Sequence, residues 1–176
     1  MPKLMEEYIP WLPLKVYPDE CLTNMCEPVE DVTPEVQTFV QDMVQTMYTA
    51  DGIGLAAPQV GRDQRIIVVD CSKDRSKLRK LINPKIVAKR GHISMVEGCL
   101  SFPGLTLQVS RAREIDVEAL DPNGNPISFS CRNVEAVCIQ HEIDHLDGIT
   151  FEKRVSRQVR RAAFRKWDKE KKRAEQ

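Results

Sequence analysis

At 176 residues the chain is long enough to bury a hydrophobic core without disulfides, and its composition is 41% hydrophobic and 30% charged. This composition excludes an intrinsically disordered chain, and no apolar run approaches the ~18 residues of a membrane-spanning helix. The 26 basic and 26 acidic residues cancel, but residues 153–176 hold eleven Lys or Arg against three acids, which favours either contact with nucleic acid or another polyanion, or a solvated helix face.

The N-terminal residues and the cysteines indicate the cellular compartment. Residues 1–8 include acids and no apolar segment flanked by bases, so they resemble neither a secretory signal nor an Arg-rich transit peptide. Six cysteines are scattered along the chain rather than grouped as a disulfide framework. We therefore expect a cytoplasmic protein that enters no membrane, with reduced thiols, most of them buried.

The first predicted element is a helix that begins at Thr33-Pro34. Threonine is a suitable N-cap, and proline is favoured at the first helical position. Apolar residues then recur at helical spacing: Val36, Val40, Met43, Val44 and Met47. The pattern predicts a core-facing helix that ends at the turn-forming Ala50-Asp51-Gly52.

Short β-branched segments follow this helix. Residues 65–70 and 81–87 are apolar runs that predict strands. Residues 115–120 alternate between apolar and polar side chains, and the Pro- and Gly-containing turn at 121–126 leads into 127–130. These last segments predict a hairpin with one face in water.

From Asn133 the apolar period becomes helical again. Five residues lie at offsets 0, 3, 4, 7 and 11, which at ~100° per residue form one stripe: Val134, Val137, Cys138, His141 and His145. Gly148 ends this helix, and a last helix is predicted with four inward residues: Val155, Val159, Ala163 and Trp167. The order of elements predicts an α+β fold, with antiparallel sheets around the central helix that bears the histidines, plus a C-terminal helix.

The sequence His141-Glu142-Ile143-Asp144-His145 is typical of a metal site. Residues four apart lie on one helical face, so both imidazoles can bind one ion while Glu142 reaches a water at that ion. A lone buried histidine is more often an ordinary core residue than a metal ligand. Two histidines at this spacing with a glutamate between them are more often metal ligands. The pattern favours a metal-dependent hydrolase with Glu142 as its acid-base residue.

A catalytic tetrahedral ion usually has three protein ligands, so a third must come from elsewhere in the chain. The extended His-x-x-Gly-x-x-His motif of one peptidase class is not completed, because Phe151 stands in place of its last histidine. A downstream glutamate is the third ligand in another class of peptidase. The candidates here lie beside or within the basic segment rather than in a second apolar helix, which disfavours them: Glu152, Glu170 and Glu175. Cys99 follows a glycine that would let the backbone approach an ion, although a cysteine alone is more often a buried apolar residue.

Two other classes of protein remain open on these residues alone. One is a zinc peptidase of the His-Glu-x-x-His type. The other is an RNA-binding module with a structural metal, which would need a fourth ligand; His92 is the remaining histidine. That second alternative rests on the basic segment and leaves Glu142 without a purpose.

Three stretches resemble the signature motifs of the peptide deformylase family, in the family's order and at about its usual separations. They are residues 52–59, 97–101 and 140–145, and the similarity extends over nearly all of residues 14–165. A chain of this length is expected to form a single catalytic domain over residues 1–176. The resemblance implies an enzyme that removes the N-formyl group from the initiator methionine of nascent polypeptides and releases formate.

The same resemblance implies roles for particular residues. The metal-binding set would be Cys99, His141 and His145. Glu142 would shuttle protons, and Gln59 with the backbone N–H of Leu100 would bind the oxyanion that develops on the formyl group. Family members natively use Fe(II) and tolerate zinc, nickel or cobalt, and a thiolate with two imidazoles is compatible with zinc or iron.

The resemblance also implies which residues meet the substrate. The backbone of Gly54 would pair with the peptide chain. The methionine pocket would be lined by residues that would otherwise be taken as ordinary core: Ile53, Val134, Val137 and Cys138. Arg111 would pair with Glu97 as a brace for the cysteine loop.

Three features bear on how far the resemblance extends. Extra residues precede the family's usual start, as an extension over residues 1–13. Segment 105–107 lacks the basic residue with which some relatives hold the peptide backbone. The C-terminal helix of relatives docks on the ribosome, and the basic helix expected over residues 153–176 would suit ribosomal RNA.

Overall fold

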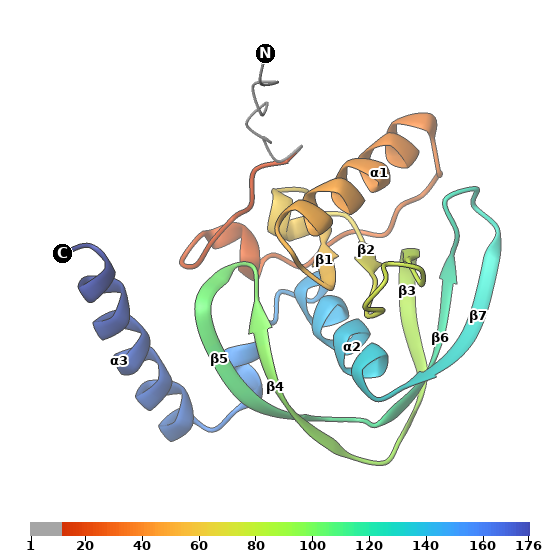
Figure 1. Ribbon diagram of the computed structural model, residues 1–176. Helices are drawn as coiled ribbons and strands as arrows, with labels where there is room; N and C mark the ends of the chain where they lie inside the picture. Colours follow the sequence, from red (N-terminus) through yellow and green to blue (C-terminus); the bar gives the residue numbers. More distant parts are fainter. Residues whose placement is uncertain (1–11) are drawn as a thin grey trace.

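The computed structural model describes residues 12–176, so the first eleven residues of the predicted N-terminal extension lie outside the described part (Figure 1). The helices are α1 (Pro34–Thr49), α2 (Val134–Leu146) and α3 (Arg157–Ala174). The strands are β1 (Gly54–Ala56), β2 (Ile66–Val69), β3 (Arg79–Arg90), β4 (Ile93–Cys99), β5 (Phe102–Arg111), β6 (Glu114–Leu120) and β7 (Pro126–Arg132). Short 3-10 helices are η1 (Glu20–Thr23), η2 (Ala57–Val60) and η3 (Phe151–Arg154).

The strands form two antiparallel sheets. A five-stranded sheet has the order β1-β2-β3-β6-β7, and β4 pairs with β5 in a separate two-stranded sheet. The predicted hairpin is the β6–β7 pair, whose register runs from Glu114 opposite Arg132 to Leu120 opposite Pro126. The α+β fold class is confirmed, but the β4–β5 sheet was not predicted.

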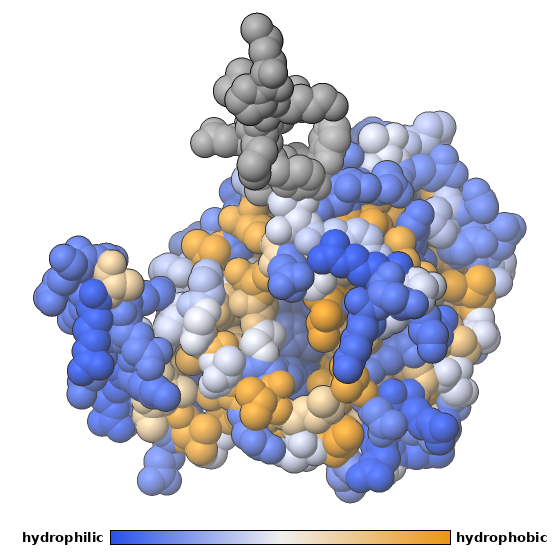
Figure 2. Space-filling view, in the orientation of Figure 1, coloured by the Kyte–Doolittle hydropathy of each residue, from blue (hydrophilic) through white to orange (hydrophobic). Residues whose placement is uncertain are grey.

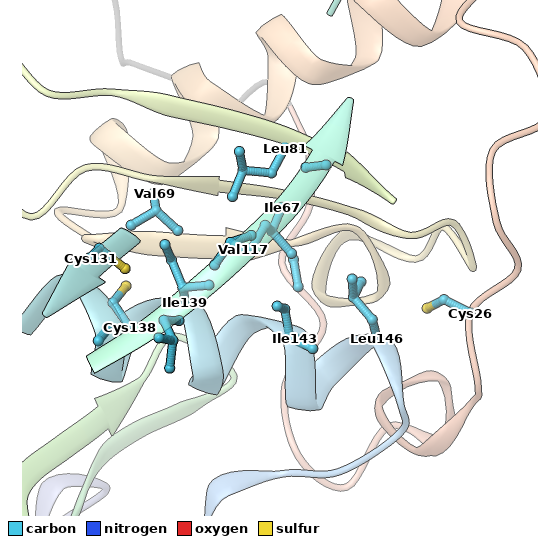
Figure 3. Packing of buried hydrophobic residues seen from close by; sticks show 14 residues of the cluster. Cys26, Ile67, Val69, Leu81, Val117, Cys131, Cys138, Ile139, Ile143 and Leu146 are labelled. Carbon is cyan, nitrogen blue, oxygen red and sulfur yellow. The ribbon is translucent and has the colours of Figure 1, made fainter. Parts of the chain in front are cut away.

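Helices α1 and α2 cover opposite faces of the five-stranded sheet. Alternate side chains of a strand point to opposite faces. In β2, Ile66 and Val68 join the hydrophobic cluster of α1, whereas Ile67 and Val69 join that of α2. Figure 3 shows the second cluster, with Ile139 of α2 facing these strands. The sheet is therefore buried on both faces in this region.

Helix α1 begins and ends where the sequence predicts. The Thr33 hydroxyl accepts a hydrogen bond from the Val36 backbone N–H at 3.3 Å, and Pro34 occupies the first turn. Ala50 is the C-cap residue. The predicted inward residues are all buried: Val36, Val40, Met43, Val44 and Met47.

Helix α2 lies between the two sheets (Figure 1). Every residue from Ala136 to Leu146 is buried, so this helix is enclosed around its whole circumference. One side packs against the five-stranded sheet through Ile139 and Leu146. This enclosure removes the polar residues of α2 from water. Each of them therefore costs free energy unless it is hydrogen-bonded or paired with an opposite charge.

Helix α3 projects along the edge of the body and packs on β5 through a cluster of aromatic residues (Figure 1). Trp167 is 3% exposed, and its indole N–H donates to the Pro103 carbonyl at 2.7 Å. The prediction that Val159 points inward is wrong, because that side chain is 47% exposed. The basic segment is also not one helix: η3 ends at Arg154 and α3 begins at Arg157.

All six cysteines are free thiols, as expected. Three of them are buried, namely Cys26, Cys131 and Cys138, and the other three are half-buried, so the expectation that most are buried is not met. Within residues 12–176, no helix has the length and apolar character needed to cross a membrane.

Candidate metal centre

Two buried histidines on α2 form the base of the site. His141 is 7% exposed and His145 is 1% exposed, and their ring centroids lie 5.1 Å apart. The spacing of four residues brings both imidazoles to the same side of the helix. The helix therefore presents two nitrogen donors toward the β4–β5 sheet.

The third donor comes from the end of β4. Cys99 is the last residue of this strand, where the chain turns sharply and pairs with Phe102 at the start of β5. Its Sγ atom lies 3.4 Å from Nε2 of His145. One potential ligand atom each from Cys99, His141 and His145 lies within 4.8 Å of the others, which is the grouping that the sequence predicts.

A buried ionic network orients His141. Glu97 lies 2.8 Å from His141 Nδ1, and both oxygens of this carboxylate accept hydrogen bonds from Arg111, at 2.6 and 2.9 Å. Arg111 also donates to Asp144 at 2.9 Å. Because Glu97 engages Nδ1, the Nε2 atom of His141 is the one left to act as a ligand. The pairing of Arg111 with Glu97 agrees with the predicted brace.

The charges of the site fit a bound cation. Burial acts to lower the pKa of His141, but its hydrogen bonds with Cys99 and Glu97 outweigh burial and raise the pKa to about 10. The cluster thus stabilises positive charge at this point. Burial lowers the pKa of His145 well below its usual range, so that imidazole is neutral, the form that binds metals. A thiol and two imidazoles at these distances suit a divalent transition ion.

Glu142 lies beside the cluster and is 4% exposed. Its Oε2 atom has no hydrogen-bond partner in the described part of the chain. Burial raises the pKa of this carboxyl group to about 7. A Cβ atom at Gly54 would lie 2.6 Å from Oε1 of Glu142 and 2.8 Å from Sγ of Cys138, so glycine is required for this close approach.

Gln59 faces the cysteine from η2. Its Oε1 accepts from the Ala56 backbone N–H at 2.9 Å, which fixes the direction of the amide. The Nε2 group then donates to Ser101 Oγ at 3.2 Å and lies 3.6 Å from Cys99 Sγ. An amide held in this orientation presents a hydrogen-bond donor beside the cluster. Leu100 stands in the turn between Cys99 and Ser101.

A pocket of about 470 Å³ opens onto this site (Figure 2). Its lining includes the cluster residues Cys99 and His141, together with Gln59, Leu100 and Glu142. It also includes the predicted substrate residues: Ile53, Gly54, Glu97, Val134, Val137 and Cys138. All the predicted site residues except the buried His145 therefore meet at one pocket. Its walls are mainly apolar, and Ile53 at its edge is 51% exposed.

Several residues of the site were not found from the sequence. Ser101 is fully buried and contacts Gln59, while Asp144 anchors Arg111 from the other side of the network. Both residues lie within segments that resemble family motifs, 97–101 and 140–145, so their sequence position indicates that they are near the site. Met95 and Val96 also line the pocket, but they belong to the unpredicted strand β4.

The fold and the site define an α+β protein in which a half-buried cysteine and two buried histidines meet beside a glutamate whose Oε2 has no hydrogen-bond partner in the described chain. Comparison with known proteins gives the family: the model of the polypeptide deformylase family matches residues 11–161. The peptide deformylase of Hydrogenovibrio crunogenus is 45% identical over 159 residues, which are 90% of this chain and 94% of that relative. The chain belongs to the polypeptide deformylase family and is an enzyme.

Solved structures of the same family have the same fold. A peptide deformylase from Legionella pneumophila has a TM-score of 0.87 at 40% identity, covering 94% of this chain and 98% of that one. A peptide deformylase from Synechococcus elongatus, in complex with actinonin, has a TM-score of 0.86 at 41% identity, covering 90% of this chain and 88% of that one. These matches confirm the resemblance inferred from the three motifs.

Proposed function

We propose that this chain hydrolyses the N-formyl group of formyl-methionyl polypeptides and releases formate. The observation that supports this most directly is the convergence of Cys99, His141 and His145 within 4.8 Å, at the base of a largely apolar pocket. The family match supports the same conclusion and disfavours both the zinc peptidase and the RNA-binding module.

Cys99, His141 and His145 would hold one divalent ion. Such an ion supplies Lewis acidity, which makes water a stronger nucleophile at neutral pH. Glu97 holds His141 through Nδ1 at 2.8 Å and so keeps that ring in one orientation. We infer Fe(II) as the native ion, with zinc, nickel or cobalt able to replace it; one thiolate and two imidazoles are compatible with each of these metals.

Two groups around the cluster would act on the reacting atoms. Glu142, with a pKa raised by burial to about 7, can accept a proton from the attacking water and return it to the departing amine. Gln59 Nε2, oriented through its own Oε1, can donate to the formyl oxygen as it gains negative charge, together with the N–H of Leu100. A donor of this kind commonly contributes ~10²–10³ in turnover.

The pocket would accommodate the methionine side chain. Its apolar lining, which includes Ile53, Val134 and Val137, can bury an unbranched thioether chain. Strand β1 is an edge strand of the five-stranded sheet, so an extended peptide can pair with its backbone at Gly54. Glu97 also lines the pocket, although its carboxylate is already paired with His141 and Arg111.

We further infer that the enzyme acts in the cytoplasm on chains leaving the ribosome. The support for this is the charge of α3, which has many exposed basic side chains and one buried anchor, Trp167. Such a helix can contact the phosphates of ribosomal RNA. The inference rests on the deformylase activity and on the resemblance to family members that use this helix in the same way.

Formate release tests the proposed activity. Purified protein, loaded with Fe(II) without oxygen, is given formyl-Met-Ala-Ser in one assay and unformylated Met-Ala-Ser in another. We expect formate and intact Met-Ala-Ser in the first assay and no reaction in the second. Cleavage of a peptide bond without formate release would contradict the proposal and favour a peptidase.

A further inference from the structure

Arg154 belongs to the basic C-terminal segment, but its guanidinium contacts the helix of the metal centre. It is the last residue of η3, and its side chain is 42% exposed. Two of its nitrogens donate to the carboxylate of Asp144 on α2: Nε to Oδ2 at 2.9 Å and Nη2 to Oδ1 at 2.6 Å. The fork of an arginine matches a carboxylate in this two-bonded geometry. Arg154 therefore ties η3 to the helix that presents His141 and His145.

The carboxylate of Asp144 depends on two arginines. This residue directly precedes His145 and is buried. Its Oδ2 also accepts from Nη1 of Arg111 at 2.9 Å, whereas in the described part of the chain Oδ1 accepts from Arg154 alone. Without Arg154, a buried carboxylate oxygen would lose its partner, which is a costly arrangement. The fork of Arg111 could reduce this cost by turning toward Asp144.

Arg111 is the residue for which two carboxylates compete. Its Nε and Nη2 donate to the two oxygens of Glu97 at 2.6 and 2.9 Å, which leaves Nη1 for Asp144. All three of these side chains are buried. One buried positive charge therefore faces two buried negative charges, and Arg154 supplies the second positive charge.

Glu97 connects this network to the metal centre. Its Oε1 lies 2.8 Å from Nδ1 of His141, and this contact leaves Nε2 of the ring to act as a ligand. The same Oε1 accepts from Nη2 of Arg111. If Arg111 turned toward Asp144, Glu97 would lose bonds that fix its orientation, and the His141 ring would be held less firmly.

We propose that Arg154 is a positioning residue for the metal centre, acting through Asp144 and Arg111 on the carboxylate that holds His141. It satisfies Asp144, so that the fork of Arg111 stays on Glu97. None of Arg111, Asp144 and Arg154 lines the pocket at the metal centre. Loss of Arg154 should therefore weaken metal retention and lower kcat, while KM stays unchanged. The effect on kcat rests on the proposed deformylase activity, whereas the effect on metal retention does not.

The release of cobalt to a chelator tests this role directly. Co(II) is one of the ions that the donor set can hold, and its visible absorption reports its own loss. Arg154→Met removes the charge and both donors but keeps an extended side chain. We expect release ~tenfold faster than from the unaltered protein, because an outer partner of a metal ligand commonly contributes ~10–100-fold to affinity or activity. The absorption of the bound ion should also shift, since His141 is less firmly oriented.

Arg65→Met is the matched control, because Arg65 makes a similar contact at the end of the same helix. It donates to Asp147 at 2.9 Å and to the Leu146 carbonyl at 3.2 Å. Within residues 12–176 it makes no hydrogen bond with Glu97 or Asp144. Thermal unfolding of both variants measures the loss of stability, and the control should release cobalt at the rate of the unaltered protein. Equal release from the two variants would overturn the proposal.

Two further variants separate positioning from stability. In Asp144→Asn the charge that competes for Arg111 is absent, so adding Arg154→Met should change the release rate little; additive effects would overturn the proposal. Arg154→Lys is milder, since it keeps the charge without the two-bonded contact, and it should release cobalt at an intermediate rate. A rate equal to that of the unaltered protein would also count against the proposal. If the unaltered protein released no formate, the proposed function would fail, while the cobalt measurements would still decide the role of Arg154.

Discussion

The fold buries the carboxylate of Glu142 without giving both of its oxygens a hydrogen-bond partner. It is 4% exposed, and its Oε2 atom has no partner in the described chain. A buried polar group without a hydrogen bond destabilises a fold, so packing does not explain this residue. Its pKa, raised by burial to about 7, is close to the pH at which a carboxyl group is most useful as both proton acceptor and donor.

Replacing this carboxylate should separate metal binding from chemistry. Glu142→Gln keeps the shape of the side chain and leaves the three ligands in place, so we expect normal metal content and a turnover lower by ~10² or more. Both are measured on the same preparation. Glu118→Gln, an exposed position on β6, is the control and should retain full activity. Undiminished turnover in Glu142→Gln would remove this residue from the mechanism.

The pKa of His141 determines how the affinity for metal is expected to depend on pH. Its pKa is raised to about 10, because its hydrogen bonds with Cys99 and Glu97 outweigh the opposite effect of burial. At neutral pH the metal-free imidazole therefore has a proton that it must lose to become a ligand. Adding Zn²⁺ to metal-free protein should release protons, and the affinity should rise between pH 6 and pH 8. A pH indicator and titrations across this range measure both effects, and a pH-independent affinity would contradict the expectation.

At the scale of elements, the site depends on α2 lying between two sheets. The five-stranded sheet supports one side of this helix, and the β4–β5 sheet brings Cys99 to the other. Cys99 and His145 are 46 residues apart in the chain, yet their ligand atoms lie 3.4 Å apart. Helix α1 takes no direct part in the cluster, but it buries the opposite face of the same sheet and so stabilises the scaffold.

The N-cap of α1 offers a direct test of this scaffold. Thr33→Ala removes the hydroxyl that accepts from Val36 N–H, and we expect the free energy of unfolding to fall by ~1 kcal/mol. Thr38→Ala is the control, because that hydroxyl only donates to the Pro34 carbonyl within the same helix. Urea denaturation of both variants measures the difference. Equal stability of the Thr33 variant and the unaltered protein would show that this cap contributes nothing to the free energy of unfolding.

The elements that the sequence predicts correctly are those with local signals. Helix α1 has a cap residue and a helical apolar period, and the β6–β7 hairpin has an alternating strand and a turn. The β4–β5 sheet also has a partial signal, since Leu105, Leu107 and Val109 alternate and are buried. This alternation directly follows the cysteine motif, and it extends over only part of β5.

Other features could not be predicted because they depend on contacts between distant segments. The spacing within α2 indicates two metal ligands, but no local pattern identifies Cys99 as the third; only the family resemblance did so. Val159 stands at a helical position relative to Trp167, yet it is exposed because α3 docks on β5 through the residues around Trp167 and leaves its first turn in solvent. How far a helix is covered depends on its neighbours rather than on its own period.

The molecule as a whole has a net charge of zero, but its positive and negative charges lie in different parts of the chain. The last 24 residues are basic and the rest of the chain is acidic in balance. This asymmetry can orient the enzyme toward a polyanion while its acidic remainder is repelled. In the proposed function, the orienting surface is α3 and the polyanion is ribosomal RNA.

Charge reversal on α3 tests this orientation without removing the helix. The variant has three exposed arginines replaced: Arg160→Glu, Arg161→Glu and Arg165→Glu. Trp167 is retained, so the helix should stay docked. We expect loss of co-sedimentation with ribosomes at low salt and unchanged activity on formyl-Met-Ala-Ser.

A control variant changes three exposed basic residues outside α3: Lys73→Glu, Lys77→Glu and Arg132→Glu. It should sediment with ribosomes as the unaltered protein does. Equal sedimentation of both variants would show that α3 is not the ribosome-binding element.

The packing of Trp167 gives the enzyme an optical label of its own. The indole is shielded by Phe102 and Phe164, and the Lys171 ammonium lies 3.5 Å from the centre of its ring. The chain has two tryptophans, so a Trp11→Phe substitution leaves this indole as the single tryptophan, whose emission can be excited selectively over that of the tyrosines. Its fluorescence maximum and its quenching by iodide then report in real time whether the C-terminal helix is seated on the body or has lifted away, with no dye attached.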